Sequence, residues 1–229
     1  QIALPGGCNF GARPIDLHLS SLAELGAKIS LEDNIIHASA PNGLIGTELT
    51  LPKSSVGATE NLIMAATFAK GTTTIHNSAI EPEIFDLINF INKMGGKIKH
   101  LGGKSLVIKG VSQLESCTHT IIGDRIEAGT YLIAAAATQG HISVNNVNPK
   151  HLEYVLEKLR ECGADISTTA SGIELKMPRK PKSISITTLP FPGFPTDLQA
   201  QWLALNINST GNSSITDTIY EKRISHVSE

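Results

Sequence analysis

The sequence predicts an α/β protein built from a repeated unit of helices and strands, and three observations indicate this. A Gly-x-Lys/Asp-Ile motif recurs about every 69 residues, beginning at Gly26, Gly95 and Gly163; repetition at such a period is typical of stacked structural units. Three further segments are apolar or small around nearly a whole helical circumference. Each of these segments is followed by a glycine and a β-branched stretch, which favours a strand.

Each glycine motif ends an amphipathic helix and begins a strand. In the third copy, Asn148 and Pro149 open the helix, and proline is favoured in a first helical turn. One face then carries apolar residues at helical spacing, and Gly163 closes the helix. The apolar residues of this face are Leu152, Val155, Leu156 and Leu159.

The apolar segments predict helices of a second kind, which we expect to be buried on all sides because no face is polar. They are Ala58–Ala69, Thr130–Thr138 and Gln199–Ile207. The predicted unit therefore reads buried helix, strand, amphipathic helix, strand, strand. This order places helices inside and sheets outside, although periodicity alone does not distinguish it from an ordinary α/β sandwich.

Hairpin signals join the paired strands, at Leu101–Lys104 and Ala170–Gly172. About two repeats fit before residue 122, and about one and a half follow. We therefore predict two domains. Residues 1–122 form the rear part of one domain, and residues 123–229 form the front part of the other.

Composition excludes several classes of function. The 19 basic and 21 acidic side chains give a net charge of −2, and no basic block predicts a nucleic-acid partner. No apolar run approaches the roughly 18 residues needed to cross a membrane. Three cysteines do not form a disulfide framework and are typical of a reducing cytosol, so we expect a cytoplasmic protein. The eight histidines lack metal-ligand spacing, so no metal site is predicted.

The buried helices begin with polar residues, and helix N-termini suit anions because their N–H groups are unpaired. The run Lys53, Ser54, Ser55, Val56 and Gly57 is the best placed, since Gly57 lets a ligand approach the backbone. Simple capping of the helix by serine or aspartate is the alternative.

A second candidate site is the segment that begins at Pro5, with three glycines and two prolines within ten residues and Cys8 near its centre. The glycine spacing is not that of a Walker A loop, so nucleotide hydrolysis is not predicted. Because Cys8 lies near Arg13, it is a candidate nucleophile or acid. The alternative is that Cys8 is an unreactive small residue. Cys117 and Cys162 are expected to be buried.

Six segments resemble, in order, motifs of the enolpyruvyl transferases that act on UDP-N-acetylglucosamine. The related 5-enolpyruvylshikimate-3-phosphate synthases share the fold but lack the Gly-Gly-Cys loop, so their resemblance is weaker. The matching segments are Pro5–His18, Ser55–Thr59 with Glu81–Glu83, Asp124–Thr130, Phe194–Gln201 and Ile219–Arg223.

The resemblance implies a two-domain inside-out α/β barrel of βαβαββ units, each domain incomplete in this chain. It also implies transfer of enolpyruvate from phosphoenolpyruvate to the 3′-hydroxyl of UDP-N-acetylglucosamine, with release of phosphate and without a metal or organic cofactor. This reaction is the first committed step of peptidoglycan synthesis.

The resemblance further implies roles for individual residues. Cys8 is the general acid and the thiol that fosfomycin alkylates, and Asp197 is the base for the 3′-hydroxyl. Residues that bind the sugar nucleotide are Arg13, Pro14, Ile15, Asp16, Leu17, Lys53, Ser54, Ser55, Val56, Gly57 and Ile219. The family's phosphoenolpyruvate-binding Lys-Asn pair is expected before residue 1. A non-catalytic nucleotide-sugar-binding or scaffold fragment therefore remains the alternative function.

Overall fold

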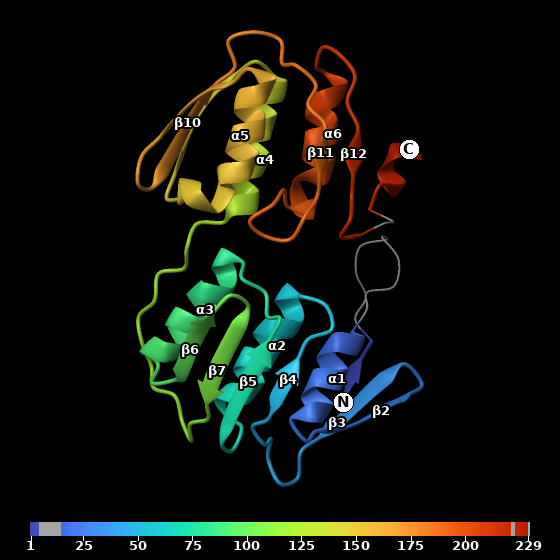
Figure 1. Cartoon of the computed structure of the whole chain (residues 1–229), viewed down its shortest axis with the longest axis vertical. Helices are drawn as coiled ribbons and strands as arrows, with labels where there is room; N and C mark the ends of the chain where they lie inside the picture. The colour runs from blue at the N-terminus through green and yellow to red at the C-terminus, as the bar shows by residue number, and fades with distance from the viewer. Residues whose placement is uncertain (5–14, 221–222, 229) are drawn as a thin grey trace. The chain divides into compact units, whose positions relative to one another are not determined.

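The chain forms two compact units in a computed structural model that describes residues 1–4, 15–220 and 223–228 (Figure 1). Unit 1 is Gln1–Ile121 and unit 2 is Ile122–Glu229. Each unit has its own core of buried apolar side chains. The division falls one residue before the predicted boundary, and the interpretation of each unit as part of a larger domain stays a prediction.

Unit 1 contains three helices and seven strands among its described residues. In chain order they are β1 (Ile2–Ala3), α1 (Asp16–Glu24), β2 (Lys28–Glu32), β3 (Ile35–Ser39), β4 (Glu48–Thr50), α2 (Val56–Thr67), β5 (Thr72–His76), α3 (Pro82–Lys93), β6 (Lys97–Gly102) and β7 (Ser105–Lys109).

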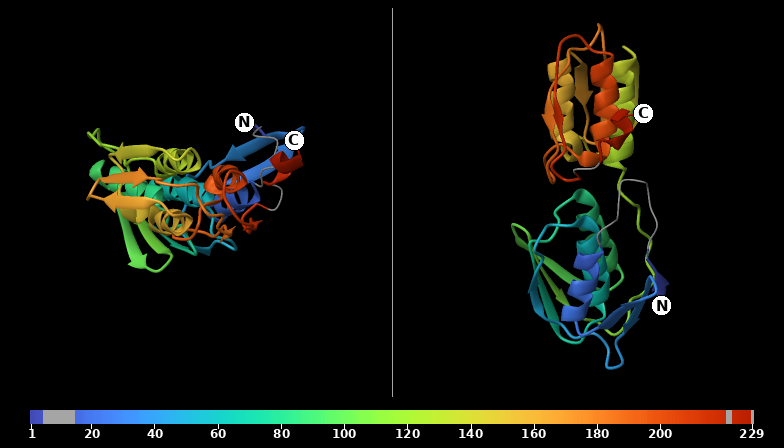
Figure 2. Two further views of the ribbon diagram at one scale, coloured as in Figure 1. Left: turned by 90° about the horizontal axis from the view of Figure 1, so that it is seen from above. Right: turned by 90° about the vertical axis from the view of Figure 1, so that its right-hand side faces the viewer.

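One complete βαβαββ unit runs from β4 to β7. Its four-stranded sheet has the order β4-β5-β7-β6, in which β4 and β5 are parallel and the other pairs are antiparallel. Helix α2 contacts both α1 and α3, and the strands lie along the outside of the helices (Figure 2). This is the predicted order of elements.

Unit 2 repeats much of this pattern, with sheets β8-β10-β9 and β11-β12. Strands β11 and β12 are parallel, as β4 and β5 are in unit 1. The elements of unit 2 are α4 (Arg125–Ala137), β8 (His141–Asn145), η1 (Pro149–Leu152), α5 (Glu153–Cys162), β9 (Asp165–Thr168), β10 (Gly172–Lys176), β11 (Ile186–Thr187), η2 (Thr196–Leu198), α6 (Gln199–Ile207), β12 (Ile215–Thr216) and η3 (Ser225–Ser228).

The glycine motif occurs at the same structural position in three places, between a helix and a β-hairpin. Helices α1, α3 and α5 each lead into an antiparallel hairpin, and the last hairpin strand pairs antiparallel with the strand that precedes the helix. Gly26, Gly95 and Gly163 follow these helices with φ values of 93°, 98° and 106°. Glycine occupies this left-handed region without the steric penalty that a Cβ atom causes, so the predicted repeat is confirmed.

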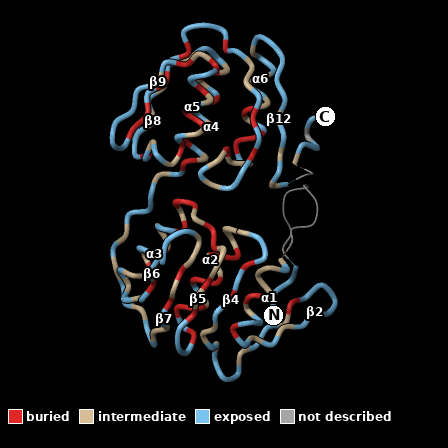
Figure 3. The backbone as a smooth tube through the Cα atoms, in the orientation of Figure 1, coloured by how far each residue is buried: buried red, intermediate tan, exposed pale blue. Residues whose placement is uncertain are grey.

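The second kind of helix is less buried than the sequence predicts. Along helices α2, α4 and α6, buried residues alternate with exposed or half-buried ones (Figure 3). The exposed fractions of Met64, of Phe68 directly after α2, of Tyr131 and of Ile207 lie between 47% and 79%. The expectation of burial on all sides is therefore wrong for each unit taken by itself. Within a unit, neighbouring helices and strands cover only part of the circumference of these helices.

The segment between β7 and α4 has no regular structure at residues 113–124. His119 Nε2 lies 3.0 Å from Asp86 Oδ1 of α3, and the Glu115 N–H donates to the Met94 carbonyl at 2.8 Å. Cys117, in this segment, is only half-buried, so the expectation that it is buried is wrong. Cys162 is buried as predicted, in α5.

Candidate functional site

The N-terminus of α2 is held by a serine cap. Ser55 Oγ accepts a hydrogen bond from the Ala58 N–H at 3.3 Å, and Thr59 Oγ1 donates to the Ser55 carbonyl at 2.7 Å. Thr59 Oγ1 also accepts from the Ala79 N–H at 2.9 Å, which ties the first turn of α2 to the chain after β5. The first N–H groups of a helix have no intrahelical acceptor, so those of Val56 and Gly57 lie at the open end.

Lys53 and Ser54 precede this cap. Lys53 is exposed, whereas Ser54 is half-buried and its hydroxyl donates to the Ser78 carbonyl at 3.4 Å. A flexible ammonium therefore stands two residues before a helix cap, where the helix dipole also favours negative charge. Capping by Ser55 and binding of an anion are compatible here, because the cap satisfies only part of the first turn.

A second predicted segment lies against the first. Ile15 is the residue before α1, Asp16 and Leu17 begin that helix, and α1 packs against α2. The side chain of His18 lies between them, with Nδ1 2.6 Å from Asn61 Nδ2. The structure thus places His18, the residue after Leu17, against Gly57 and Asn61 of α2. Cys8, Arg13 and Pro14 lie outside the described residues.

The close neighbour of Gly57 is the His18 ring. A Cβ atom at position 57 would lie 3.2 Å from His18 Cε1. The sequence predicts that the absence of a side chain at Gly57 leaves room for a ligand. In the structure, the imidazole ring of His18 lies beside Gly57. His18 and Asn61 are absent from the predicted site, because their contact joins residues 43 apart in the chain.

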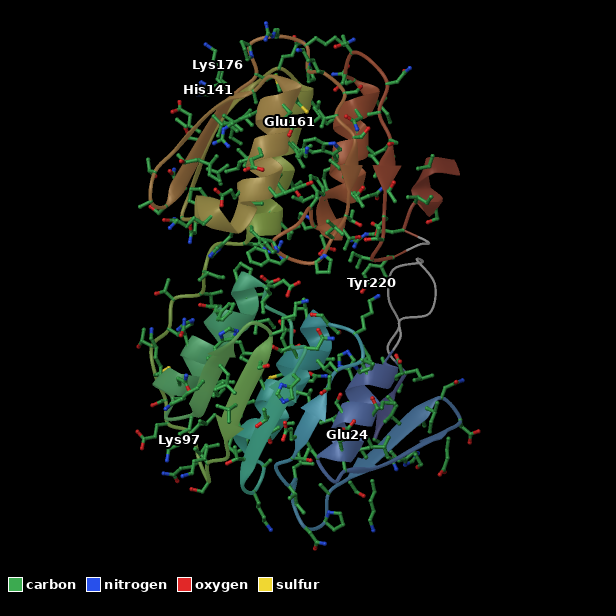
Figure 4. The ribbon with its side chains drawn as sticks, in the orientation of Figure 1. Glu24, Lys97, His141, Glu161, Lys176 and Tyr220 are labelled. Carbon is green, nitrogen blue, oxygen red and sulfur yellow. The ribbon has the colours of Figure 1, made fainter. Side chains whose placement is uncertain are left out.

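In unit 2, Asp197 lies in the short helix η2 and is paired with a cation. Its Oδ1 atom is 2.7 Å from Arg223 NH2, and the two side chains are 52% and 22% exposed. Arg223 also donates to Thr196 Oγ1 at 3.2 Å and lies 5.8 Å from the ring centre of Tyr220. Tyr220 is labelled in Figure 4. Sequence reasoning missed the pairing of Arg223 with Asp197, because these residues are distant in the chain.

Asp217 connects Asp197 to Ile219. It accepts hydrogen bonds from the hydroxyls of Thr188 and Thr196 at 2.9 and 2.6 Å, and from the backbone N–H groups of Ile219 and Tyr220, both at 2.9 Å. Thr196 thus donates to Asp217 and accepts from Arg223.

The hydrogen bonds of Asp217 also change its acidity. Partial burial raises the pKa of this carboxyl. The hydrogen bonds from Thr196, from the two backbone N–H groups and from Thr188 together lower the pKa by more than burial raises it, so the net shift is downward. The ionised Asp217 carboxylate is therefore the form that organises the turn carrying Ile219.

The N-terminus of α4 fits capping better than anion binding. Asp124 Oδ1 accepts from the N–H groups of Ile126 and Glu127 at 2.7 and 3.2 Å. A surface hollow of about 500 Å³ adjoins this end of the helix, and the carboxylates of Asp124 and Glu127 line it. Two carboxylates oppose the binding of an anion.

Two classes of feature are absent from residues 1–4, 15–220 and 223–228. No group of three or more His, Cys, Asp or Glu side chains there is placed to hold a metal ion. Likewise, no helix in this part of the chain is long and apolar enough to cross a membrane.

Several curated proteins similar to the chain carry the name UDP-N-acetylglucosamine 1-carboxyvinyltransferase. Those of Actinobacillus succinogenes and Coxiella burnetii are 50% identical to it, and that of Pasteurella multocida is 49% identical, each over 230 residues and 100% of the chain. The alignments cover 55%, 53% and 54% of these relatives. The chain therefore spans about half the length of the curated relatives it matches.

Solved structures show the fold. The enolpyruvyl transferase NikO of Streptomyces tendae matches with a TM-score of 0.83, covering 94% of the chain and 54% of that protein. An EPSP synthase of Acinetobacter baumannii matches with a TM-score of 0.63, covering 95% of the chain and 53% of that protein. Both are 18% identical to the chain, so these matches concern the fold alone. They confirm the predicted enolpyruvyl transferase fold.

The family assignment rests on the whole length of the chain. A family model described as EPSP synthase (3-phosphoshikimate 1-carboxyvinyltransferase) matches residues 1–229. Its match includes both units and both candidate sites. The chain therefore belongs to the EPSP synthase family, whose members include enolpyruvyl transferases.

Proposed function

We propose that the chain is the central part of an enzyme that transfers enolpyruvate from phosphoenolpyruvate to the 3′-hydroxyl of UDP-N-acetylglucosamine. The observation that supports this most is the 50% identity, over the whole chain, to relatives named for that activity. The proposal concerns the complete protein. It places the enzyme in the cytoplasm, at the first committed step of peptidoglycan synthesis.

In this proposal, Asp197 accepts the proton of the 3′-hydroxyl as its oxygen attacks C2 of phosphoenolpyruvate. The contact from Arg223 to Oδ1 supports the role, because it orients the carboxylate and leaves Oδ2 as a second acceptor. Thr196 and Asp217 hold Arg223 and the turn that carries Ile219, which we expect to contact the sugar nucleotide.

The uridine diphosphate part binds in unit 1, between the start of α1 and the N-terminus of α2. The open N–H groups of Val56 and Gly57, together with the Lys53 ammonium, suit a diphosphate. Ile15, Asp16 and Leu17 lie beside them, and the resemblance adds Arg13 and Pro14, as well as Ser54 and Ser55.

The role of Cys8 rests on the resemblance. Its thiol donates a proton to C3 of phosphoenolpyruvate while the sugar oxygen bonds to C2, which gives a tetrahedral intermediate. Loss of a proton from C3 and of phosphate from C2 then restores the double bond in the product. The same thiol is the proposed target of fosfomycin.

The test measures phosphate release by the complete protein. We expect turnover with phosphoenolpyruvate plus UDP-N-acetylglucosamine, and none with phosphoenolpyruvate plus shikimate 3-phosphate. Asp197→Asn should lower kcat by roughly 10²- to 10⁴-fold, because the amide does not accept the hydroxyl proton. Asp165→Asn is the matched control, since Asp165 is an exposed residue of β9. Turnover with shikimate 3-phosphate, or an active Asp197→Asn variant, would contradict the proposal.

A further inference from the structure

His18 occupies the contact between α1 and the N-terminus of α2. Its ring is half-buried and meets two residues of α2, Gly57 and Asn61. These two residues are four apart, so they lie on the same face of the helix. His18 itself directly follows the substrate-binding segment that ends at Leu17.

As the Asn61 amide is placed in the structure, the hydrogen bond runs from Asn61 to His18. The Asn61 atom near the ring is the amide nitrogen Nδ2, which carries two protons and no acceptor lone pair. His18 Nδ1 therefore accepts, and the neutral ring carries its proton on Nε2. The distance of 2.6 Å makes this a close contact.

Gly57 leaves room for this ring. A Cβ atom at position 57 would lie 3.2 Å from His18 Cε1 and 3.5 Å from Nε2. The first distance is shorter than ordinary van der Waals contact between carbon atoms. A side chain at this position would therefore push the imidazole ring aside by a few tenths of an ångström.

We infer that His18 is a positioning residue that fastens the two nucleotide-binding segments of unit 1 to each other. Its bond to Asn61, with the packing on Gly57, sets the start of α1 against the first turn of α2. This inference rests on the proposed function, because that function assigns both segments to one ligand. A site whose segments are held in place before binding loses less freedom when the ligand binds.

The inference predicts an effect on affinity rather than on the chemical step. The segments bind the uridine diphosphate part, which does not react, so its contacts are equal in the ground state and the transition state. Loss of such binding raises KM and leaves kcat unchanged. One hydrogen bond corresponds to a change of roughly 2- to 10-fold in affinity.

The first experiment is ¹⁵N NMR of the histidine rings in the 229-residue chain. We expect His18 to carry its proton on Nε2. Asn61→Asp should move that proton to Nδ1, because a carboxylate only accepts, whereas Asn89→Asp, at an exposed position of α3, should leave it on Nε2. A proton on Nδ1 in the unaltered chain, or no response to Asn61→Asp, would overturn the inference.

The second experiment measures the Kd of UDP and the KM of UDP-N-acetylglucosamine in the complete protein. His18→Phe keeps a ring without an acceptor, and Asn61→Leu removes the donor, so the two variants break the bond from opposite sides. Both should weaken binding roughly 2- to 10-fold at unchanged kcat. His18→Asn, which retains an acceptor near the Nδ1 position, should restore most of the affinity, and Asn89→Leu is the control.

The outcomes separate the inference from the function on which it rests. If the unaltered protein fails to bind UDP, the proposed function is wrong and the inference falls with it. If it binds UDP, and His18→Phe or Asn61→Leu binds equally well while remaining folded, the inference alone is overturned. A fall in kcat at unchanged KM would also overturn it, since His18 would then act on the chemical step.

Discussion

Asp217 shows how a single side chain organises a turn. Four hydrogen bonds converge on its carboxylate, from two threonine hydroxyls and two consecutive backbone N–H groups. Hydrogen bonds to an ionised acceptor are stronger than neutral ones. The partly exposed pair of Asp197 and Arg223 contributes less to stability, because water screens it. Asp217 therefore has a structural role, whereas the chemical role of Asp197 belongs to the proposed function.

Asp217→Asn should lower the free energy of unfolding of the chain by about 1–2 kcal/mol at pH 7, because the amide is a neutral and weaker acceptor. The pKa of Asp217 is lowered by folding, so its stabilisation is complete above the unfolded value of about 4 and is lost as the pH falls through the lower folded value. Denaturant unfolding at pH 7 and at pH 2 measures this. A difference between the two proteins that does not shrink as the pH falls would contradict the assignment.

The cysteines should differ in reactivity. The pKa of the Cys162 thiol is raised to about 12, mainly by burial and to a smaller extent by the neighbouring Glu161, against a lowering effect of Lys158. The thiolate is the form that reacts, so native Cys162 should resist iodoacetamide at pH 8. We expect Cys8 to react first, followed by the half-buried Cys117. Peptide mass mapping over time gives the order, and Cys8→Ser should remove the fast phase; rapid labelling of Cys162 would contradict the prediction.

At the scale of elements, one helix-hairpin design occurs three times, in α1-β2-β3, α3-β6-β7 and α5-β9-β10. Each copy changes direction at a glycine with a positive φ. The surroundings of these glycines are open, with only Arg179 Nε, 3.9 Å from the Cβ position of residue 163, within contact distance. Steric crowding by neighbours therefore does not explain the glycines, and backbone conformation does.

Gly163→Ala should consequently lower the free energy of unfolding by about 1–2 kcal/mol, the cost of a left-handed conformation for an L-residue. Gly26→Ala and Gly95→Ala should have similar costs if the three copies are equivalent. Chemical denaturation of the three variants measures this. A cost near zero at Gly163 would show that another backbone conformation closes the helix.

At the scale of the whole molecule, the chain spans about half of its curated relatives. Both units leave apolar residues exposed on helices of the second kind, among them Phe68 in unit 1 and Ile207 in unit 2. Exposed apolar residues that gather on one face favour association.

The resemblance also places phosphoenolpyruvate-binding residues outside positions 1–229. The 229-residue chain is therefore expected to lack part of the proposed site.

We predict that the 229-residue chain does not release phosphate from phosphoenolpyruvate and UDP-N-acetylglucosamine, although the complete protein does. Loss of one positioned charge donor costs roughly 10²- to 10³-fold in rate, and several are absent together. The assay compares both proteins at equal concentration, with calorimetric binding of UDP as the control for a folded site. Comparable turnover by the two proteins would contradict this prediction.

Much of the element order follows from the sequence, because each element has a local cause. The glycines at 95 and 163 end helices through backbone conformation, and the apolar spacing of Leu152–Leu159 indicates the covered face of α5. Exposure on α2 was not predictable in the same way. Met64 and Phe68 are as apolar as their buried neighbours, so only the packing of other elements determines which face is covered.

The candidate site, like the fold, was only partly predictable from the sequence. From the sequence alone, the resemblance proposes Asp197, Ile219 and the segment Lys53–Gly57 as candidate site residues, because their types and neighbours form recognisable motifs. Only the tertiary structure pairs Asp197 with Arg223, joins Ile219 to it through Asp217, and places His18 between Gly57 and Asn61. These contacts link residues that are distant in the chain. Local pattern determines which side chains are available, whereas folding determines which of them meet, because a hydrogen bond depends on distance in space and not on separation in sequence.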